Sequence, residues 1–351
     1  MDGTYPSEQH EELRISPWHF IVGSRRTSGL GRGGDLRSPS LLSTMTHALA
    51  RNVIGSSAIL PITAAEYAQL LVARDAVLDL LFTEEKFDLV VQNYIELETE
   101  LLGSTLQDII TNVTDWQWFQ NQRSLLNRRL QNLLSATRGY LEYFRHAIHE
   151  LLGRNSPKAL ACANRLSSHY DSCLGYRVME ALRNHTQHRG FPIHVVEISS
   201  EQAESELRNR FKFCIAVSAK TSFLREDKKF KAGVLHELEA LGEIVDLKPM
   251  IRDYVAAVAD VHEFLREQLN EDVASWEGQI ESAIGRFSAT FPSEPSLNGL
   301  TAFVLNGTQR SEVIPIFFEM IQYRRHLAAT GSSLKRLGVF YVSGETIASD
   351  V

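Results

Sequence analysis

The sequence predicts a mainly α-helical protein in which an antiparallel helical bundle is followed by a smaller α+β domain. Between about residues 63 and 190, apolar residues recur at three- and four-residue spacing with few glycines or prolines, which is typical of amphipathic helices. After Pro192 the pattern changes to short β-type runs between further helical segments. With 351 residues, 44% of them hydrophobic and 23% charged, the chain can bury a substantial core and divide into two domains.

We expect residues 1–57 to form a flexible N-terminal segment, because turn-forming residues and scattered charges occur there without an apolar period. Gly29, Gly31 and Gly34 have the G-x-G-x-x-G spacing of a dinucleotide-binding loop. No helical pattern follows these glycines and Pro39 comes soon after them, so the structural context of such a loop is missing. We therefore predict no nucleotide cofactor at this segment.

Residues 58–190 are expected to form the bundle, which we interpret as HEPN-like for reasons given below. The four expected helices are residues 64–81, 84–110, 115–152 and 156–189. Short connections between consecutive long helices favour antiparallel neighbours. The last of them has a recognisable start, because Ser156 is a good N-cap residue and Pro157 suits the first turn.

Residues 191–351 are expected to form an α+β domain whose role the sequence does not indicate. The expected strands are residues 192–198, 210–217, 302–305 and 337–342, and the expected helices are residues 227–242, 247–290 and 311–329. In the second of these strands every odd position is apolar, which is typical of a strand with one buried face.

Basic residues interleaved with phenylalanines run through this strand and the segment after it. The candidate RNA-binding residues are Arg210, Lys212, Lys228 and Lys229, since basic side chains pair with phosphates while neighbouring aromatic rings stack on bases. In the alternative interpretation the phenylalanines belong to the core and the lysines form a solvated rim. A net charge of −7 argues against bulk attraction to nucleic acid, so RNA contact requires a local patch of this kind.

The remaining composition favours a soluble cytoplasmic protein. Cys162, Cys173 and Cys214 fit neither a disulfide framework nor a thiolate metal site, and an odd number of cysteines is natural where thiols stay reduced. The N-terminus lacks the apolar core of a signal peptide, and no run approaches the roughly 18 apolar residues of a membrane span. We expect no membrane association.

Sequence signatures of metal and hydrolase sites are weak or missing. Glu142, His146 and His149 share one helix face, but no further ligand is identifiable, so a solvated face is favoured over a metal site. Neither a G-x-S-x-G nor an H-E-x-x-H pattern occurs. We assign no metal and no cofactor.

The chemically richest stretch lies at the end of the last bundle helix. Gly190 can adopt the left-handed cap conformation and Pro192 stops the helix, so residues 183–188 occupy its last turns. Asn184 and His188 are four residues apart and share one face, with Arg183 about a hundred degrees round the helix. A guanidinium, an amide and an imidazole can thus face one cavity.

These side chains suit RNA cleavage without a metal, which needs a base for the 2′-hydroxyl proton, an acid for the leaving oxygen and a cation for the phosphorane. One histidine cannot do both proton transfers at once, but two copies related by a two-fold axis can. The same spacing separates Arg189 from His194, yet Pro192 interrupts that pair. Arg183 and His188 lie on a continuous helical pattern.

The segment Arg183-Asn184-His185-Thr186-Gln187-His188 resembles the R-x4-6-H motif of the HEPN superfamily, including the form with asparagine after arginine. In that family a helical bundle dimerises, paired motifs form one composite site, and many members are metal-independent endoribonucleases of toxin–antitoxin, phage-defence or RNA-processing systems. The resemblance covers about residues 60–190. It implies Arg183 and His188 as catalytic residues with Asn184 beside them, a homodimer, RNA as substrate, and an antitoxin or defence-complex partner.

Three neighbouring residues are candidate supporting groups. Glu180 stands three residues before Arg183 and can pair with its guanidinium, which would either orient it or neutralise it toward phosphate. His185 is closer to a bystander, with a role behind the catalytic residues left open, and Gln187 is the third supporting candidate. The alternative function is a non-catalytic HEPN-like binding or regulatory subunit of a defence or toxin–antitoxin complex, whose polar helix end is an interface. A plain solvated helix end is the simplest alternative.

Overall fold

The computed structural model describes residues 46–111, 115–202, 210–294, 296–306, 309–331 and 345–347. Within these residues the chain forms eight helices and eight strands, so the mainly α prediction is confirmed. The chain divides into two compact units, and these are not the two expected domains. Unit 1 combines Met1–Tyr67 with Phe287–Phe317, and unit 2 combines Ala68–Arg286 with Phe318–Val351.

Unit 1 contains an antiparallel sheet with the strand order β2-β1-β6-β7. Its strands are β1 (Thr46–Arg51), β2 (Ile59–Ile62), β6 (Leu300–Asn306) and β7 (Gln309–Pro315). Strand β1 falls within the segment expected to be flexible, and β7 occupies the start of an expected helix. Because β1 pairs with a strand some 250 positions later, in a register that sets Ala48 opposite Phe303, no local pattern in the sequence reveals it. Residues 1–45 lie outside the described residues.

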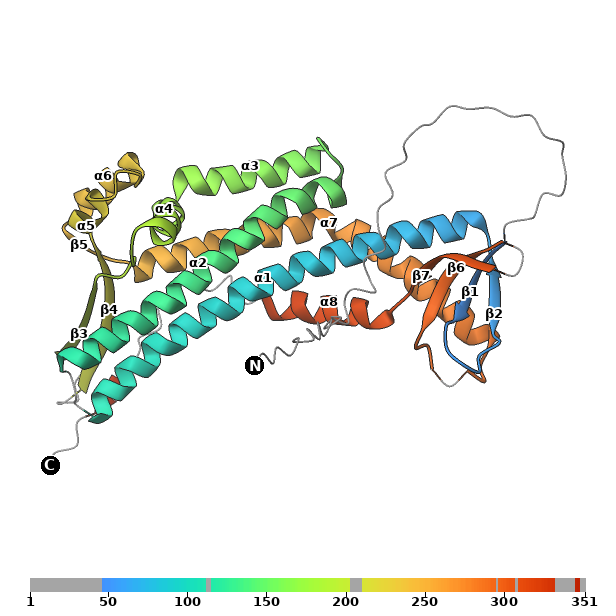
Figure 1. Cartoon of the computed structure of the whole chain (residues 1–351), viewed down its shortest axis with the longest axis horizontal. Helices are drawn as coiled ribbons and strands as arrows, with labels where there is room; N and C mark the ends of the chain where they lie inside the picture. The colour runs from blue at the N-terminus through green and yellow to red at the C-terminus, as the bar shows by residue number, and fades with distance from the viewer. Residues whose placement is uncertain are drawn as a thin grey trace, which may run out of the picture. The chain divides into compact units, whose positions relative to one another are not determined.

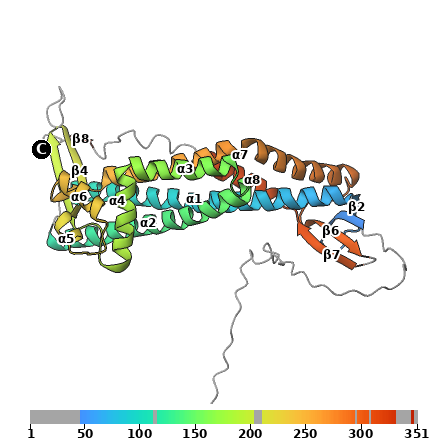
Figure 2. The ribbon, with the colours of Figure 1, turned by 90° about the horizontal axis from the view of Figure 1, so that it is seen from above.

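Long helices make up most of unit 2 (Figures 1 and 2). They are α1 (Ala64–Thr111), α2 (Trp116–Leu152), α3 (Pro157–Ser172), α4 (Leu174–His188), α7 (Lys248–Thr290) and α8 (Phe318–Gly331), and the ends of α1 and α7 belong to unit 1. In unit 2, α1 and α2 run side by side in both views. Ser156 caps α3 as expected, since its Oγ accepts a hydrogen bond from the N–H of Ala159 at 3.0 Å.

Two expected helix boundaries differ from the observed ones. The expected helices 64–81 and 84–110 are one continuous helix, in which the hydroxyl of Thr83 donates to the carbonyl of Asp79 at 2.8 Å and so stays within the helical ladder. The expected helix 156–189 instead breaks at Cys173, where α3 ends and α4 begins. Just after this break, Gly175 lets α7 approach closely, because a β-carbon there would lie 2.7 Å from the carbonyl oxygen of Met250.

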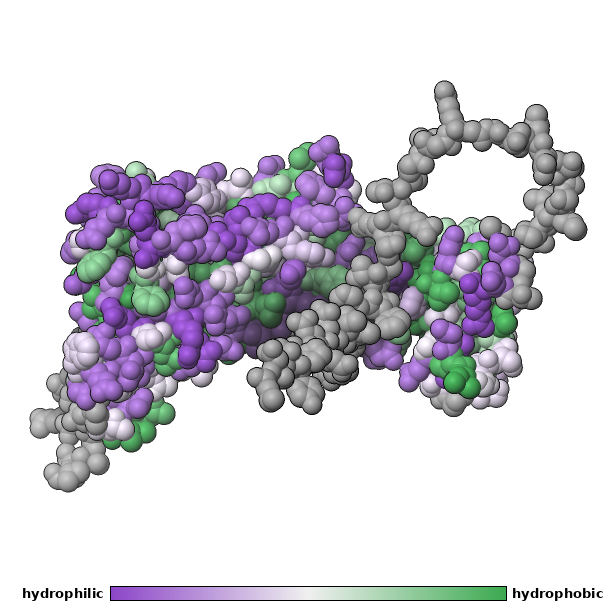
Figure 3. Space-filling view, viewed as in Figure 1, coloured by the Kyte–Doolittle hydropathy of each residue, from purple (hydrophilic) through white to green (hydrophobic). Residues whose placement is uncertain are grey.

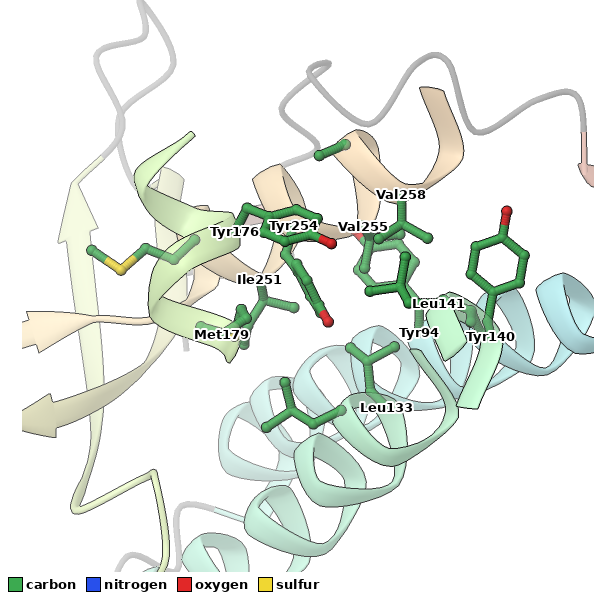
Figure 4. Close-up of a cluster of buried hydrophobic side chains, with 14 of the residues drawn as sticks. Tyr94, Leu133, Tyr140, Leu141, Tyr176, Met179, Ile251, Tyr254, Val255 and Val258 are labelled. Carbon is green, nitrogen blue, oxygen red and sulfur yellow. The ribbon is translucent and has the colours of Figure 1, made fainter. Parts of the chain in front are cut away.

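The core of unit 2 lies between α1, α2, α4 and α7 and is rich in tyrosine (Figure 4). Tyr94, Tyr140, Tyr176 and Tyr254 are all buried there among leucine, isoleucine and valine side chains. Buried tyrosines need partners for their hydroxyl groups. Three of these hydroxyls reach polar side chains inside the bundle, since Tyr94 bonds to Glu98 at 2.7 Å, Tyr140 to His262 at 3.0 Å and Tyr254 to Glu180 at 2.6 Å.

One group of buried polar side chains links three helices of the bundle. Glu84 of α1 accepts hydrogen bonds from Nε2 of His262 at 3.0 Å and from Nη2 of Arg266 at 2.6 Å, both in α7. Tyr140 of α2 completes the chain with its hydroxyl 3.0 Å from Nδ1 of His262. The side chains of Glu84 and His262 are each only 1% exposed. Glu84, His262 and Tyr140 therefore depend on one another and on Arg266 for these contacts, whereas Arg266 also reaches Glu263 at 3.5 Å.

A second antiparallel sheet belongs to unit 2. It consists of β3 (Val195–Gln202), β4 (Arg210–Lys220), β5 (Ile244–Asp246) and β8 (Glu345–Ile347), with the short helices α5 (Thr221–Arg225) and α6 (Ala232–Leu241) between β4 and β5. Ile215 and Val217 of β4 belong to the same buried cluster as the bundle side chains. The expected boundary at residue 190 is therefore not a boundary between compact units. The expected strand 337–342 lies outside the described residues.

The surface of unit 2 seen in Figure 3 is mainly hydrophilic, with scattered apolar residues. In the part of the chain that the structure describes, each helix is too short or too polar to cross a membrane.

Candidate functional site

Helix α4 ends where the sequence predicts, and its last turns carry the candidate residues. The cap residue Arg189 has a φ of −137°, and its N–H donates to the carbonyl oxygen of His185 at 2.8 Å. Gly190 donates to the same carbonyl at 3.4 Å, but it does not adopt the left-handed conformation that we expected. Pro192 has no N–H to extend the ladder. The helix therefore stops after His188, and the chain continues to β3 (Figure 1).

Arg183 and Asn184 are joined by a hydrogen bond at this helix end, with His188 one turn further on. Nη1 of Arg183 donates to Oδ1 of Asn184 at 3.0 Å. Asn184 and His188 are exposed, whereas Arg183 is half-buried. Nε of Arg183 is buried and has no hydrogen-bond partner among the described residues. The buried Nε cannot reach a ligand, but the terminal nitrogens make one hydrogen bond among the described residues, to Asn184, and so keep donors for a further acceptor.

Arg183 also borders a pocket between α2 and α4 with a volume of about 240 Å³, called here the α2–α4 pocket. It is lined by Gln131, Asn132, Leu134, Ser135, Arg183, Thr186 and Gln187. Arg183 contributes the only ionised group among these residues, and five of the others carry an amide or a hydroxyl. The pocket therefore suits a polar, negatively charged group. His188 is not among its lining residues.

Glu180 does not contact Arg183 as expected. Its carboxylate accepts a hydrogen bond from the hydroxyl of Tyr254 at 2.6 Å and lies 3.6 Å from Nη1 of Arg138. This arrangement ties α4 to α2 and α7 and leaves the charge of the Arg183 guanidinium without this carboxylate beside it.

His185 faces a different pocket from Arg183 and forms a buried pair with Asp227. Nδ1 of His185 lies 2.9 Å from Oδ2 of Asp227, and the two side chains are 6% and 4% exposed. Oδ1 of Asp227 accepts a hydrogen bond from the N–H of Lys229 at 3.0 Å and lies 3.4 Å from Nε of Arg189. Although burial raises the pKa of the Asp227 carboxyl, the hydrogen bonds from His185 and Lys229 lower it overall. An ionised Asp227 fixes the Nδ1–H of His185 and leaves its Nε2 as an acceptor.

The pocket in front of this pair, called here the α4–β3 pocket, has a volume of about 310 Å³. It is lined by Arg123, His185, Arg189, Gly190, Phe191, Ile193, His194, Phe223, Glu226 and Asp227. Asn127 of α2 holds the backbone at Ile193, one of the lining residues. Its buried side-chain amide accepts a hydrogen bond from the N–H of Ile193 and donates one to the carbonyl oxygen of Ile193, both at 2.9 Å. The segment after α4 is thus held rigidly against α2.

His194 is held as a neutral imidazole of known tautomer. The backbone N–H of Lys220 donates to Nδ1 of His194 at 3.1 Å, so the proton of the neutral ring is on Nε2. Burial, together with the neighbouring His185, Arg123 and Lys220, lowers the pKa of His194 to about 4. Its ring stacks on Phe223 with a centroid distance of 4.9 Å. At neutral pH His194 therefore acts as a hydrogen-bond donor from a fixed position.

Two of the four candidate RNA-binding residues have side chains that the structure describes. Lys228 and Lys229 are exposed in the connection between α5 and α6. The backbone of Arg210 and Lys212 is in β4, but their side chains lie outside the described residues. Phe230 is buried, in agreement with the core alternative, whereas Phe223 is exposed at the α4–β3 pocket.

The α4–β3 pocket contains functional candidates that the sequence did not indicate. Asp227 lies 42 positions after His185, and Arg123 comes from a helix that precedes both, so no short motif joins them. The one available signal was the spacing between Arg189 and His194, which we discounted because Pro192 interrupts it. That break is what brings both residues to the same pocket.

Among the described residues, no group of three or more His, Cys, Asp or Glu side chains is arranged to hold a metal ion. Glu142, His146 and His149 are all exposed, as a solvated helix face would be. In the comparisons with known proteins, no family model, curated sequence or solved structure matches this chain.

Proposed function

We propose that the chain is a metal-independent endoribonuclease of the toxin or phage-defence type, with a composite active site formed by Arg183, Asn184 and His188 from two copies. The observation that carries this proposal is the 3.0 Å hydrogen bond from Arg183 to Asn184 at the helix end that exposes His188. The bond orients a guanidinium whose terminal nitrogens make no other hydrogen bond among the described residues. Such a guanidinium binds phosphate readily because it is always charged and offers several donors.

In the proposed reaction the 2′-hydroxyl oxygen of RNA attacks the adjacent phosphorus, and one His188 takes the hydroxyl proton. The bond from phosphorus to the 5′-oxygen breaks, and His188 of the second copy gives its proton to that oxygen. The products are a 2′,3′-cyclic phosphate end and a 5′-hydroxyl end. Arg183 stabilises the charge that develops on the phosphorane oxygens.

In this proposal the α2–α4 pocket binds the parts of the RNA next to the cleaved phosphate. Amide and hydroxyl side chains line the pocket together with Arg183, and one of them, Gln187, is exposed. These groups can hydrogen-bond to a ribose or a base while Arg183 holds the phosphate. Gln187 thus supports substrate binding in this proposal, whereas Glu180 only braces α4.

The first experiment measures RNA cleavage by the purified protein in EDTA, with His188→Ala and Arg183→Ala as test variants. His149→Ala is the matched control, because His149 is an exposed histidine in the last turn of another helix. We expect cleavage by the wild type and the control, a loss of at least about a hundredfold in each test variant, and 2′,3′-cyclic phosphate ends on the product. Equal cleavage by wild type and His188→Ala would refute the assignment.

A mixing experiment tests the composite site. Wild type and His188→Ala are combined, allowed to exchange subunits, and assayed at constant total protein. If both copies of His188 are needed, an equal mixture retains about a quarter of the wild-type activity, whereas independent sites retain about half. The alternative function, a binding or regulatory subunit, predicts a stable complex with RNA or protein and no cleavage by any variant. The proposal includes a cytoplasmic location, which suits three cysteines that are all free thiols.

A further inference from the structure

We propose that the α4–β3 pocket is a second ligand site, and that it binds an organic phosphate monoester with a planar ring. The site lies within one chain and uses none of Arg183, Asn184 and His188. The proposal therefore does not depend on RNA cleavage at the end of α4. It follows from three features of the pocket, which are its donors, its charges and its exposed rings.

The donors come from side chains whose orientation is already fixed. Nδ1 of His194 is occupied by the N–H of Lys220, so Nε2–H is the group that remains for a ligand. Nδ1 of His185 is occupied by Asp227, so its Nε2 accepts a hydrogen bond from a protonated phosphate oxygen or donates one when the ring is protonated. Two imidazoles held in this way lose little conformational entropy on binding, which favours affinity.

The charges of the lining balance, since Arg123 and Arg189 are set against Asp227 and Glu226, but the two arginines differ in whether a carboxylate already pairs with them. Arg123 donates to the neutral side chain of Gln120 at 2.7 Å, and no carboxylate pairs with it among the described residues. Arg189 is about half exposed and shares Asp227 with His185. Glu226 is exposed on the wall of the same pocket and opposes an anion. Arg123 is therefore the strongest candidate for the direct phosphate contact.

Two exposed phenylalanines border these polar groups. Phe191 is 55% exposed and Phe223 is 50% exposed, although both are large apolar side chains. One face of the Phe223 ring is stacked on His194, which holds the ring in place. Aromatic rings beside the Arg123 guanidinium offer a stacking surface to a flat ring on the ligand. Together with Arg123 they favour a phosphate attached to an aromatic or heteroaromatic group over inorganic phosphate alone.

Isothermal titration calorimetry with three probes tests this chemistry. The probes are phenyl phosphate, inorganic phosphate and phenol, titrated into the full chain near neutral pH. We expect phenyl phosphate to bind at least about tenfold more tightly than either fragment, since only it combines charge and ring. The proposal would be overturned if phenyl phosphate did not bind, or if phenol bound as tightly as phenyl phosphate.

Four variants assign the contacts. Arg123→Ala is expected to weaken phenyl phosphate binding about tenfold to a hundredfold, while Arg128→Ala, an exposed arginine on the same helix, leaves it unchanged. Phe223→Leu should lower the affinity for phenyl phosphate to that for inorganic phosphate. Glu226→Gln should raise the affinity for both phenyl phosphate and inorganic phosphate. Far-UV circular dichroism checks that each variant is folded. Equal losses in Arg123→Ala and Arg128→Ala would refute the site.

Two further probes identify the source of the phosphate. Adenosine monophosphate represents a free small molecule, and RNA oligonucleotides with and without a 5′-phosphate represent a nucleic-acid end. Preference for the monophosphate or for the phosphorylated RNA would each support the site and name its ligand class, whereas binding of neither would overturn it. His188→Ala should retain the affinity for phenyl phosphate, so failure of the ribonuclease proposal and failure of this one are distinguishable.

Discussion

The buried group around Glu84 provides the sharpest test of the fold, through the substitution Glu84→Gln. This change keeps the size and shape of the side chain but removes the negative charge that His262 and Arg266 contact. Burial alone would raise the pKa of Glu84. The interactions with His262 and Arg266 outweigh burial and lower the pKa from 4.5 to about 2. That difference corresponds to about 3 kcal/mol of folding free energy, similar in size to the cost of removing one partner from a buried ion pair.

The sign of the effect sets the pH range in which it appears. Because the pKa of Glu84 is lowered by folding, its contribution is fully present above pH 4.5 and is lost as the pH falls toward about 2. Burial also lowers the pKa of His262 below 6.5, so protonation of this ring begins to reduce the stability of the wild type below pH 6.5. Both groups make the folded protein more stable at neutral pH than in acid.

Urea unfolding followed by far-UV circular dichroism, at pH 7 and at steps down to pH 3, measures this effect. We expect Glu84→Gln to be less stable than the wild type by about 3 kcal/mol at pH 7, with a difference that narrows below pH 4.5. The control is Glu142→Gln, which removes an exposed carboxylate that pairs with Arg138 one turn away and should cost less than about 0.5 kcal/mol. A difference that is the same at pH 3 and pH 7, or an equal loss in the control, would refute this explanation.

Three further substitutions test how α3, α4 and β3 are held, with the urea midpoint as the measurement in each case. Asn127→Ala leaves the buried N–H and C=O of Ile193 without their partner and should cost about 3 kcal/mol, so an unchanged midpoint would contradict the proposed anchor. Gly175→Ala places a methyl group 2.7 Å from the carbonyl oxygen of Met250, and we expect a loss of about 1–3 kcal/mol, whereas a gain would show that α7 can move away. Ser156→Ala removes the N-cap of α3 and should lower the free energy of unfolding by about 1 kcal/mol. An unchanged midpoint would contradict a stabilising role for this cap.

Local patterns predicted which parts of the bundle are helical, though not every helix boundary, because helical hydrogen bonds and amphipathic faces repeat within a few residues. The start of α3 at Ser156 and Pro157 and the end of α4 before Pro192 follow from such short-range chemistry. The pairing of β1 with β6 could not be predicted in this way, since its partners are some 250 positions apart. Ile215 of the second sheet packs into the same core as the bundle side chains. This contact depends on tertiary packing, so no local pattern predicts it.

The candidate site residues also divide into those that a short sequence motif contains and those that only the fold brings together. Arg183, Asn184 and His188 share one short helical segment, so their spacing was readable, and their proposed role remains to be tested. His185 looked like a bystander because its partner, Asp227, is distant in the sequence. A proline that interrupts a helical motif also redirects the chain, and such a break can bring residues together as well as separate them.

The last turns of α4 serve two pockets at once, and this sharing links their occupancy. Arg183, Thr186 and Gln187 face one pocket, while His185 and Arg189 face the other. A ligand that shifts this stretch of helix from either pocket changes the position of the side chains that line the other pocket. We therefore expect the affinity of each pocket to depend on whether the other is occupied. If both proposed ligands bind, thermodynamic linkage requires that a phosphate ester changes the affinity for RNA by the same factor by which RNA changes the affinity for the phosphate ester.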